Sequence, residues 1–466
     1  MRFVVKIILR NCCVILLFVL LSTNVALAQD QQEEGPIYIV QSGDTLSTIA
    51  TRWSVAQQAL ISANQLDNPD QLFAGQELIL PGIDWIDGVL LPQRMPYGET
   101  LLSLSRQYRL SPALLARLSR LTSPSQLFVS YPITLPSQRG EDTSNIRSVV
   151  APGRSLIEMA ASSGSNPWTM TAENRLAGTW DVVPGDVLLV PGTDQSGPGA
   201  LPSPITLLDF PTEGLVQGKT IAINVNAEGD FTLQSEMMGQ SLDFYRQADG
   251  TYTTLLGVHA LAEPGLTPVT IRGEFSDGTP FSFTQSVAVV DGNYGFETLT
   301  VDEALLDDEL SESELEFIRS LATVATPEKL WAGFFQAPSP YSDTYNSFFG
   351  TRRSYNGGVY ESYHSGLDFG GGLGVEIFAP ATGEVVLAGP LEVRGNATLI
   401  NHGWGVYSAY YHQSEIRVQE GDIVAPGQVI GIVGNSGRST GAHLHWEIWV
   451  GGVQVDPLDW LVRPYP

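Results

Sequence analysis

The spacing of apolar residues divides the chain into regions with different local structure. Between residues 36 and 82, two short apolar runs enclose segments with helical spacing, which predicts a strand, two helices and a return strand. Four apolar residues form the inward face of the first helix: Leu46, Ile49, Ala50 and Trp53. Asp44 is placed to cap this helix, and Ser54 is placed to cap the second one.

This small unit recurs twice further along the chain. Its opening tetrapeptide returns with a period of 55 residues, as Gly43-Asp44-Thr45-Leu46, Gly98-Glu99-Thr100-Leu101 and Gly153-Arg154-Ser155-Leu156. Its closing dipeptide has the same period, as Leu80-Pro81, Leu135-Pro136 and Val190-Pro191. An identical period at both ends predicts three tandem βααβ repeats of α+β type, at residues 36–82, 88–137 and 145–192.

The apolar period falls to two after residues 193–204, a segment rich in Gly, Pro and Ser that is typical of a linker. Ile221, Ile223 and Val225 alternate with small or polar residues, and Asp-Gly pairs between such runs indicate hairpin turns. We therefore expect an antiparallel, β-sandwich-like domain at residues 205–298.

Residues 300–340 are predicted to form a helical connector. Ser311 and Glu314 form a capping-box pattern, which places a helix start near Ser311. Four apolar residues fall near one helical face: Leu306, Leu310, Phe317 and Leu321. Beyond the connector, residues 345–460 alternate short strand-like runs with turn signals. This last region is predicted to be a mainly antiparallel β domain without a long amphipathic helix.

Charge restricts the partners that the chain can have. It holds 24 Lys and Arg against 50 Asp and Glu, which gives a formal net charge of −26. Nucleic acid is excluded as a main partner, because its binding depends on neutralising phosphates with basic side chains. Anionic lipid surfaces are disfavoured for the same reason. A polysaccharide or a peptide remains possible as a substrate.

Residues 1–28 have the pattern of a secretory signal peptide. Three basic residues precede an apolar run from Val14 to Leu21, and Ala26-Leu27-Ala28 supplies small residues for cleavage after Ala28. An uncleaved anchor is the alternative, although the run is shorter than the roughly 20 residues that span a bilayer. We expect a protein that is secreted or lies in the cell envelope, extracellular or periplasmic, with no transmembrane segment after cleavage.

Candidate chemistry is concentrated near the C-terminus, where five of the six histidines fall between positions 364 and 445. His364 and Asp368 lie four residues apart in a glycine-rich turn that leads into a strand. His443 and His445 are two residues apart in a β-like run, so both should project from one face. Two histidines and one aspartate can hold zinc with a fourth position open, and further histidines, such as His412, can transfer protons.

The first repeat resembles the LysM family, on the evidence of Tyr38 to Leu46 and of Gly75 to Pro81. The resemblance implies binding of N-acetylglucosamine-containing glycans, such as peptidoglycan or chitin, in a groove between two loops. Carried over, the candidate glycan-binding residues are Gly43, Asp44, Thr45, Leu46, Asn68 and Leu72. The second repeat departs from the pattern, with Ser119 in place of the asparagine at 64 and 174. Sugar binding and a spacer role both remain open for the second and third repeats.

Residues 345–460 resemble the LytM/lysostaphin-type zinc endopeptidases. His364 to Asp368 is similar to the family's His-x-Gly-x-Asp motif, and His443 to His445 to its His-x-His motif. The resemblance implies that His364, Asp368 and His445 bind Zn²⁺, whereas His412 and His443 form the catalytic pair. Three neighbouring positions are interpreted separately: Gln413 departs from the usual leucine, His402 is structural, and Glu447 is a candidate acceptor for an imidazole N–H.

Both resemblances point to the same polymer. They imply a secreted zinc-dependent endopeptidase that cuts peptide cross-links of peptidoglycan and is tethered to glycan strands through LysM. The alternative is a non-enzymatic, peptidoglycan-binding regulator of other wall hydrolases. The sequence leaves open which bond is cut and whether a residue such as Asn346 or Asn356 covers the metal in a latent state.

Overall fold

A computed structural model describes most of the chain. The described residues are 35–83, 86, 88–123, 126–137, 145–192, 198–202, 205–227, 231–275, 278, 280–300 and 308–466. The predicted signal peptide at residues 1–28 lies outside them, as does Leu306 of the connector. The chain forms two compact units, one of residues up to 92 with 134–141 and the other of residues 93–133 with 142–466. Each unit is described by itself below.

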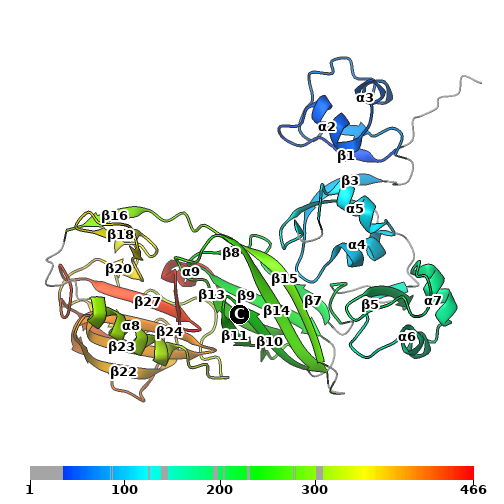
Figure 1. Cartoon of the computed structure of the whole chain (residues 1–466). Helices are drawn as coiled ribbons and strands as arrows, with labels where there is room; N and C mark the ends of the chain where they lie inside the picture. The colour runs from blue at the N-terminus through cyan, green and yellow to red at the C-terminus, as the bar shows by residue number, and fades with distance from the viewer. Residues whose placement is uncertain are drawn as a thin grey trace, which may run out of the picture. The chain divides into compact units, whose positions relative to one another are not determined.

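The first unit contains the first repeat, in the predicted order of strand, helix, helix, strand (Figure 1). Its elements are β1 (Ile37–Ile39), α2 (Leu46–Trp53), α3 (Gln57–Ala63) and β2 (Glu77–Ile79). Strand β1 pairs antiparallel with β2 and parallel with β3 (Val89–Arg94). The predicted inward face of the first helix is buried, which confirms the helical period.

The capping residues differ from the prediction. Thr45, not Asp44, caps α2, because its side chain accepts a hydrogen bond from the Thr48 amide and the Thr48 side chain accepts one from the Thr45 amide. Asp44 instead accepts hydrogen bonds from the Tyr38 hydroxyl and the Gln41 amide. Both residues are competent caps one position apart, so the sequence pattern alone did not separate them.

Ser54 does not cap the second helix either. It ends α2 in the left-handed conformation, and α3 starts after Ala56 without a side-chain cap. Left-handed residues recur after the first helix of every repeat, at Ser54, Arg109 and Gly164, and after the second helix, at Gln65, Arg120 and Arg175. The period of 55 therefore holds for backbone conformation as well as for sequence.

The second and third repeats follow the same order of elements. The second has α4 (Leu101–Tyr108), α5 (Pro112–Leu118) and β4 (Pro132–Pro136); the third has β5 (Asn145–Val149), α6 (Leu156–Ser162), α7 (Pro167–Glu173) and β6 (Val187–Pro191). Asn64 and Asn174 connect the second helix to the return strand, because each donates one hydrogen bond to a helix carbonyl and one to a strand carbonyl, and accepts one from a strand amide. The asparagine thus serves the fold, and its replacement by Ser119 carries no information about sugar binding.

Residues 205–290 form two sheets that share one apolar core. One sheet has the order β12-β13-β9-β7, with β7 (Ile205–Asp209), β9 (Thr220–Ala227), β12 (Tyr245–Arg246) and β13 (Tyr252–Gly257). The other has the order β11-β10-β14-β15-β8, with β8 (Leu215–Val216), β10 (Phe231–Met237), β11 (Gln240–Asp243), β14 (Gly265–Phe275) and β15 (Pro280–Val290). Ile221, Ile223 and Val225 are buried in the shared core, as their alternation predicted.

The C-terminal region is built on a 10-stranded sheet. Its strands are β17 (Tyr345–Ser347), β20 (Leu367–Phe369), β21 (Glu376–Phe378), β22 (Gly383–Leu391), β23 (Gly395–Gly403), β24 (Val406–Ile416), β25 (Ile423–Val424), β26 (Val429–Val433), β27 (Leu444–Val450) and β28 (Val453–Val455). A second, three-stranded sheet contains β16 (Phe296–Leu299), β18 (Arg352–Tyr355) and β19 (Ser362–Tyr363). The short helix α9 (Pro457–Val462) follows.

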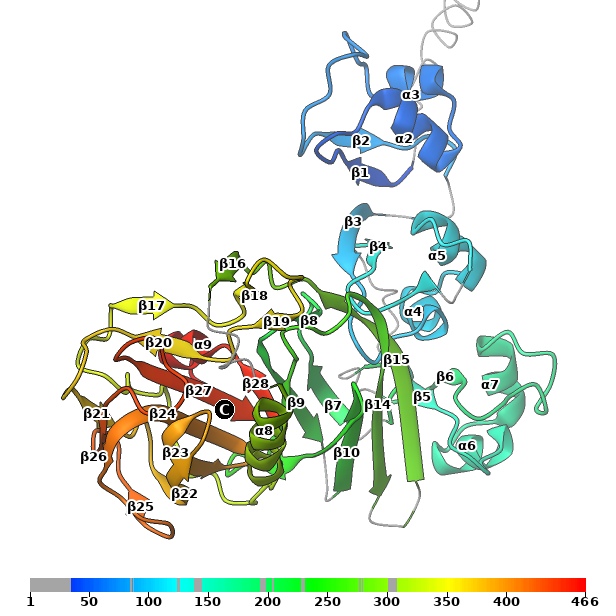
Figure 2. The same ribbon diagram turned by 60° about the vertical axis from the view of Figure 1, so that its left-hand side comes forward.

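Helix α8 (Asp308–Ala322) covers part of one face of this sheet, against β23 and β24 (Figures 1 and 2). The helix already includes Ser311, so the predicted capping box is wrong. The predicted apolar face is also shifted, because Phe317 is 44% exposed whereas Ile318 and Ala322 are buried. Within the part of the chain that the structure describes, no helix is long and apolar enough to cross a membrane.

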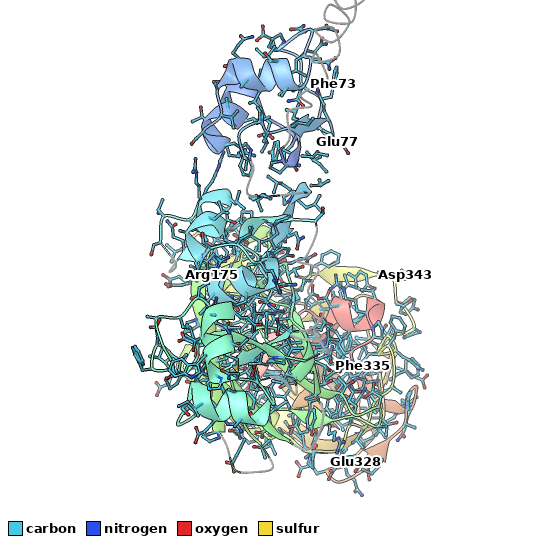
Figure 3. All side chains as sticks on the ribbon, turned by 90° about the vertical axis from the view of Figure 1, so that its right-hand side faces the viewer. Phe73, Glu77, Arg175, Glu328, Phe335 and Asp343 are labelled. Atoms are coloured by element: carbon cyan, nitrogen blue, oxygen red, sulfur yellow. The ribbon has the colours of Figure 1, made fainter. Side chains whose placement is uncertain are left out.

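The connector between α8 and the sheet packs against His402 of β23 and against helix α9. Phe335, labelled in Figure 3, contacts the ring of His402 with a centroid distance of 4.9 Å and that of Trp460 at 4.8 Å. His402 is fully buried and bonds to the Thr382 carbonyl and the Ser408 hydroxyl. These contacts agree with its interpretation as a structural histidine.

Candidate metal centre and cleft

Two neighbouring strands place the candidate metal ligands. Strand β20 carries Asp368 directly opposite His445 on β27, because the two strands pair antiparallel in this register. His364 precedes β20 and is held by a backbone hydrogen bond from its amide to the Thr351 carbonyl. A Cβ at Gly366 would lie 2.4 Å from the Trp446 carbonyl oxygen and 2.7 Å from His445 Nε2, so this close approach requires glycine.

The three side chains meet at one point. His364 Nε2 lies 3.1 Å from Asp368 Oδ1 and 3.1 Å from His445 Nδ1, and His445 Nδ1 lies 2.8 Å from Asp368 Oδ1. All three residues are buried. The sequence prediction that these residues share a site thus agrees with their positions in the structure.

The hydrogen-bond pattern shows that this group fits a cation. His364 Nδ1 lies 3.0 Å from the Phe348 carbonyl oxygen, which can only accept, so the ring proton is on Nδ1 and Nε2 carries a lone pair. With a cation bound, the His445 proton would be on Nε2, which lies 3.2 Å from Glu447 Oε1, and the Nδ1 lone pair would face the cation. Two imidazole lone pairs and a carboxylate oxygen therefore converge. Their mutual repulsion is relieved by a bound cation, and two nitrogens with one oxygen suit Zn²⁺.

The electrostatics of the group also favour positive charge. Burial would lower the pKa of His445, but the hydrogen bonds with Asp368 and Glu447 outweigh burial and raise this pKa to about 9. Burial would raise the pKa of Asp368, yet its two histidine partners hold that pKa well below the usual value. The contacts with His445 likewise lower the pKa of Glu447 to about 2, against the effect of its burial. The carboxylates of Asp368 and Glu447 thus stabilise a positive charge at this point.

His412 and His443 face each other beside the three ligands. Their ring centroids are 5.1 Å apart, and His443 Nε2 lies 3.6 Å from Asp368 Oδ1. Each donates its Nδ1 proton to a backbone carbonyl at 2.8 Å, that of Ser436 for His412 and that of Gly441 for His443. Burial, together with the neighbouring charge of His445, lowers the pKa of His412 to about 4. His412 is therefore a neutral ring with a free Nε2 lone pair at neutral pH.

His412 reaches the cleft because the strand is distorted there. In a regular strand, Tyr411 and His412 would point to opposite faces. His412 has a φ of 60°, in the left-handed region, and the pairing of β24 with β26 shifts register at the next residues. Both side chains consequently line the same cleft. Gln413 is buried and donates to the Thr398 hydroxyl and the Tyr410 carbonyl, so it lies within the sheet rather than in the cleft.

The five predicted residues lie in a cleft of about 530 Å³. Besides them, its walls include Glu297, Leu299, Thr300, Asn346, Ser347, Arg353, Tyr355, Tyr363, Ser365, Val393, Arg394, Tyr411, Arg438, Ser439, Thr440, Gly441, Ala442 and Glu447. Two of these, Glu297 and Leu299, belong to the upstream strand β16, so the wall extends beyond the histidine-rich region.

Comparison with protein families agrees with this geometry. Residues 362–457 match the model described as peptidase family M23, and residues 38–81 and 97–136 match the LysM domain. The chain carries an M23 peptidase domain. The third repeat lies outside the two matched LysM ranges, although its strands and helices follow the same order.

Related proteins share this M23 domain. It is 41% identical over 95 residues to the DD-carboxypeptidase/endopeptidase Mpg of Neisseria meningitidis serogroup B, covering 20% of this chain and 22% of the relative. It is 39% identical over 95 residues to the peptidoglycan DD-endopeptidase ShyA of Vibrio cholerae, with the same shares. The match thus spans about a fifth of the length of these curated relatives. A crystal structure of an M23 peptidase from Pseudomonas aeruginosa covers 53% of this chain and 94% of its own, with 25% identity and a TM-score of 0.40.

Sequence reasoning missed two residues of the M23 cleft. The Tyr411 ring stacks on His445 with a centroid distance of 5.6 Å and an interplanar angle of 17°, and its hydroxyl donates to Glu447 at 3.2 Å. The Arg394 guanidinium lies 5.5 Å from the centre of the Tyr411 ring. Tyr411 could have been suspected, because it adjoins His412. No pattern in the sequence pointed to Arg394.

The candidate glycan-binding residues of the first repeat divide into two groups. Asp44 pairs with Arg52 at 2.9 Å, Thr45 caps α2 and Leu46 is buried, so these side chains serve the fold. Gly43 is open, because a Cβ built there meets no atom of the described residues within 4 Å. Asn68 and Leu72 lie in the loop between α3 and β2, next to Phe73, which is 64% exposed and labelled in Figure 3.

The equivalent loop of the second repeat is covered by protein. A Cβ at Gly98 would lie 2.5 Å from Pro198, and the Gly98 amide donates to Gln285 at 3.0 Å. The Tyr97 hydroxyl donates to the Val269 carbonyl at 3.0 Å. Gly153 of the third repeat is open in the way that Gly43 is. These contacts favour the spacer role for the second repeat.

Proposed function

We propose that this protein is a zinc-dependent endopeptidase of the cell envelope that cleaves peptide cross-links of peptidoglycan. The observation that carries the proposal is the convergence of three electron-pair donors, from His364, Asp368 and His445, beside two further histidines in an open cleft. A signal peptide at residues 1–28 would deliver the chain to this compartment.

His364 Nε2, Asp368 Oδ1 and His445 Nδ1 would hold the ion, which supplies Lewis acidity to a water molecule and to the scissile carbonyl. The free Nε2 of His412, paired with His443 across the cleft, accepts a proton from the attacking water. The resulting N–H then stabilises the negative oxygen of the tetrahedral intermediate and returns the proton to the leaving amine. The proton taken from the attacking water is thus the one that the leaving amine receives, and His412 carries it between the two.

The LysM repeats would act as a tether to the glycan. The two relatives described above are named as a DD-carboxypeptidase/endopeptidase and a peptidoglycan DD-endopeptidase, and LysM-like units occupy the other end of this chain. Binding through the open loop of the first repeat makes the encounter of the cleft with the cross-link effectively intramolecular. The names of the relatives favour a D,D cross-link over a glycine bridge.

Digestion of purified peptidoglycan tests the proposal. Residues 29–466 are incubated with sacculi containing direct D,D cross-links or glycine bridges, with and without chelator, and released muropeptides are identified by mass spectrometry. We expect D,D-cross-linked dimers to disappear and chelator to abolish the reaction. Binding without cleavage by the zinc-loaded protein would instead support the regulator of other wall hydrolases.

A further inference from the structure

Helix α8 contains a buried carboxylate with an unusual set of partners. Glu314 is 8% exposed and accepts hydrogen bonds from the Val393 amide at 2.8 Å and from the Arg394 amide at 3.2 Å. It also accepts one from the Arg394 guanidinium at 3.3 Å. A carboxylate that binds two consecutive backbone amides and one side chain fixes the conformation of the segment that it holds.

The segment held by Glu314 is the hairpin turn between β22 and β23, at the rim of the cleft. Backbone carbonyl groups of this hairpin turn also accept hydrogen bonds from the segments that carry the catalytic residues. The Arg394 carbonyl accepts from the His412 amide at 3.0 Å, and the Val393 carbonyl accepts from the Arg438 amide at 2.7 Å. The second contact leads to the segment whose Ser436 carbonyl binds His412 Nδ1.

His412 needs such support, because its backbone is in a conformation that non-glycine residues rarely adopt. Residues in sparsely populated conformations persist only where the surroundings hold them. A second route from Glu314 reaches the metal ligands, since the Arg394 guanidinium covers Tyr411 and the Tyr411 ring stacks on His445. Both series of contacts begin at the side chain of Glu314 in α8.

We infer that Glu314 is a positioning residue of the peptidase, and that α8 belongs to the catalytic unit although it lies outside the matched M23 segment. The helix holds the β22–β23 turn, and the turn keeps His412 and Tyr411 in the geometry needed for turnover. The inference rests on the proposed endopeptidase function for its kinetic consequence, but the hold on the turn is independent of that function.

Glu314→Gln tests this assignment, with Glu312→Gln as the matched control on the exposed side of the same helix. Glutamine has one acceptor oxygen in place of two, so it cannot satisfy both amides and the guanidinium. Amide hydrogen exchange is measured for peptides covering residues 393–396 and 411–414. We expect exchange at least about tenfold faster in Glu314→Gln and unchanged in Glu312→Gln, because local opening becomes easier.

Kinetics on a soluble cross-linked muropeptide give the second readout. Glu314→Gln should lower kcat by about 10- to 100-fold with KM within about twofold, because misplaced groups slow the chemistry more than they weaken binding. Zinc content should remain at the wild-type level. If Glu314→Gln does not fold, as judged by circular dichroism, Glu314→Asp is measured with the same expectations at smaller amplitude.

The outcomes separate the two proposals. Unchanged exchange in the turn overturns the positioning role whatever the activity is, and so does faster exchange with a wild-type kcat. A wild-type chain that fails to cleave contradicts the endopeptidase function, whereas the exchange experiment still decides whether Glu314 holds the turn.

Discussion

Asp44 and Asp368 are both carboxylates of a recognisable motif, yet their surroundings give them different tasks. In the first repeat, Asp44 pairs with Arg52 and accepts hydrogen bonds from Tyr38 and Gln41, so the protein itself neutralises it. In the M23 domain, Asp368 Oδ1 lies 3.1 Å from His364 Nε2 and 2.8 Å from His445 Nδ1, two imidazole nitrogens that can bind a cation with it. The difference teaches that a motif carboxylate is available to a ligand only where its neighbours leave its charge uncompensated.

The largest expected effect on zinc content and turnover comes from replacing Asp368. Asp368→Asn removes the negative charge that lies beside His364 Nε2 and His445 Nδ1. We expect loss of zinc and a fall in kcat of at least about 10⁴-fold, the upper end of the cost of one lost proton-transfer group. Zinc is measured by inductively coupled plasma mass spectrometry, and activity on a soluble muropeptide. Asp343→Asn, at an exposed position labelled in Figure 3, serves as the control, and stoichiometric zinc in Asp368→Asn would contradict the ligand set.

Replacing His412 and His443, the two histidines of the cleft that are not metal ligands, should separate catalysis from metal binding. His412→Ala and His443→Ala each remove a ring that is not in the converging group, so zinc should stay. Turnover should fall by about 10²- to 10⁴-fold, because a proton-transfer or oxyanion group is lost. Zinc content and rate are measured on the same samples. If His443→Ala loses zinc while His445→Ala keeps it, the roles within the His-x-His pair are reversed.

Removing the first repeat should affect only the tether. Deletion of residues 29–82 removes the open loop at Gly43, whereas the corresponding loop of the second repeat is already covered by protein. We expect binding to insoluble peptidoglycan to weaken by about 10²-fold, as for loss of one linked site. Cleavage of a small soluble muropeptide should be unchanged. Wild-type retention on sacculi after the deletion would show that the third repeat carries the binding.

Each half of the site could be predicted from the sequence because its geometry is local. His443 lies directly before β27 and two residues before His445, and Asp368 follows His364 through a glycine turn. These features depend on backbone periodicity, which a sequence shows directly. The same reasoning predicted the buried face of α2 from its helical spacing.

Contacts between distant segments could not be predicted in this way. Glu314 lies 79 residues from Val393, and its burial depends on how α8 packs on the sheet rather than on its own helical pattern. The sequence pattern instead assigned Glu314 to a capping box with Ser311, whereas Ser311 already lies inside α8. His412 also required a break in strand alternation, which only the register shift of β24 reveals.

The smallest effect should come from replacing Asp44, and it should change the stability of the first repeat rather than catalysis. Asp44 and Arg52 are coupled by a partly buried ion pair. Asp44→Ala, Arg52→Ala and the double variant form a cycle whose coupling free energy we expect to be about 1–2 kcal/mol, within the range for residues in one network. The opening free energy of α2 is obtained from amide hydrogen exchange in the whole chain.

Glycan affinity should fall only in proportion to the unfolded fraction of the repeat, since the Asp44 carboxylate is already occupied by protein donors. A loss of affinity in a fully folded Asp44→Ala variant would show instead that this carboxylate contacts sugar, and the two motif aspartates would then be alike in serving a ligand.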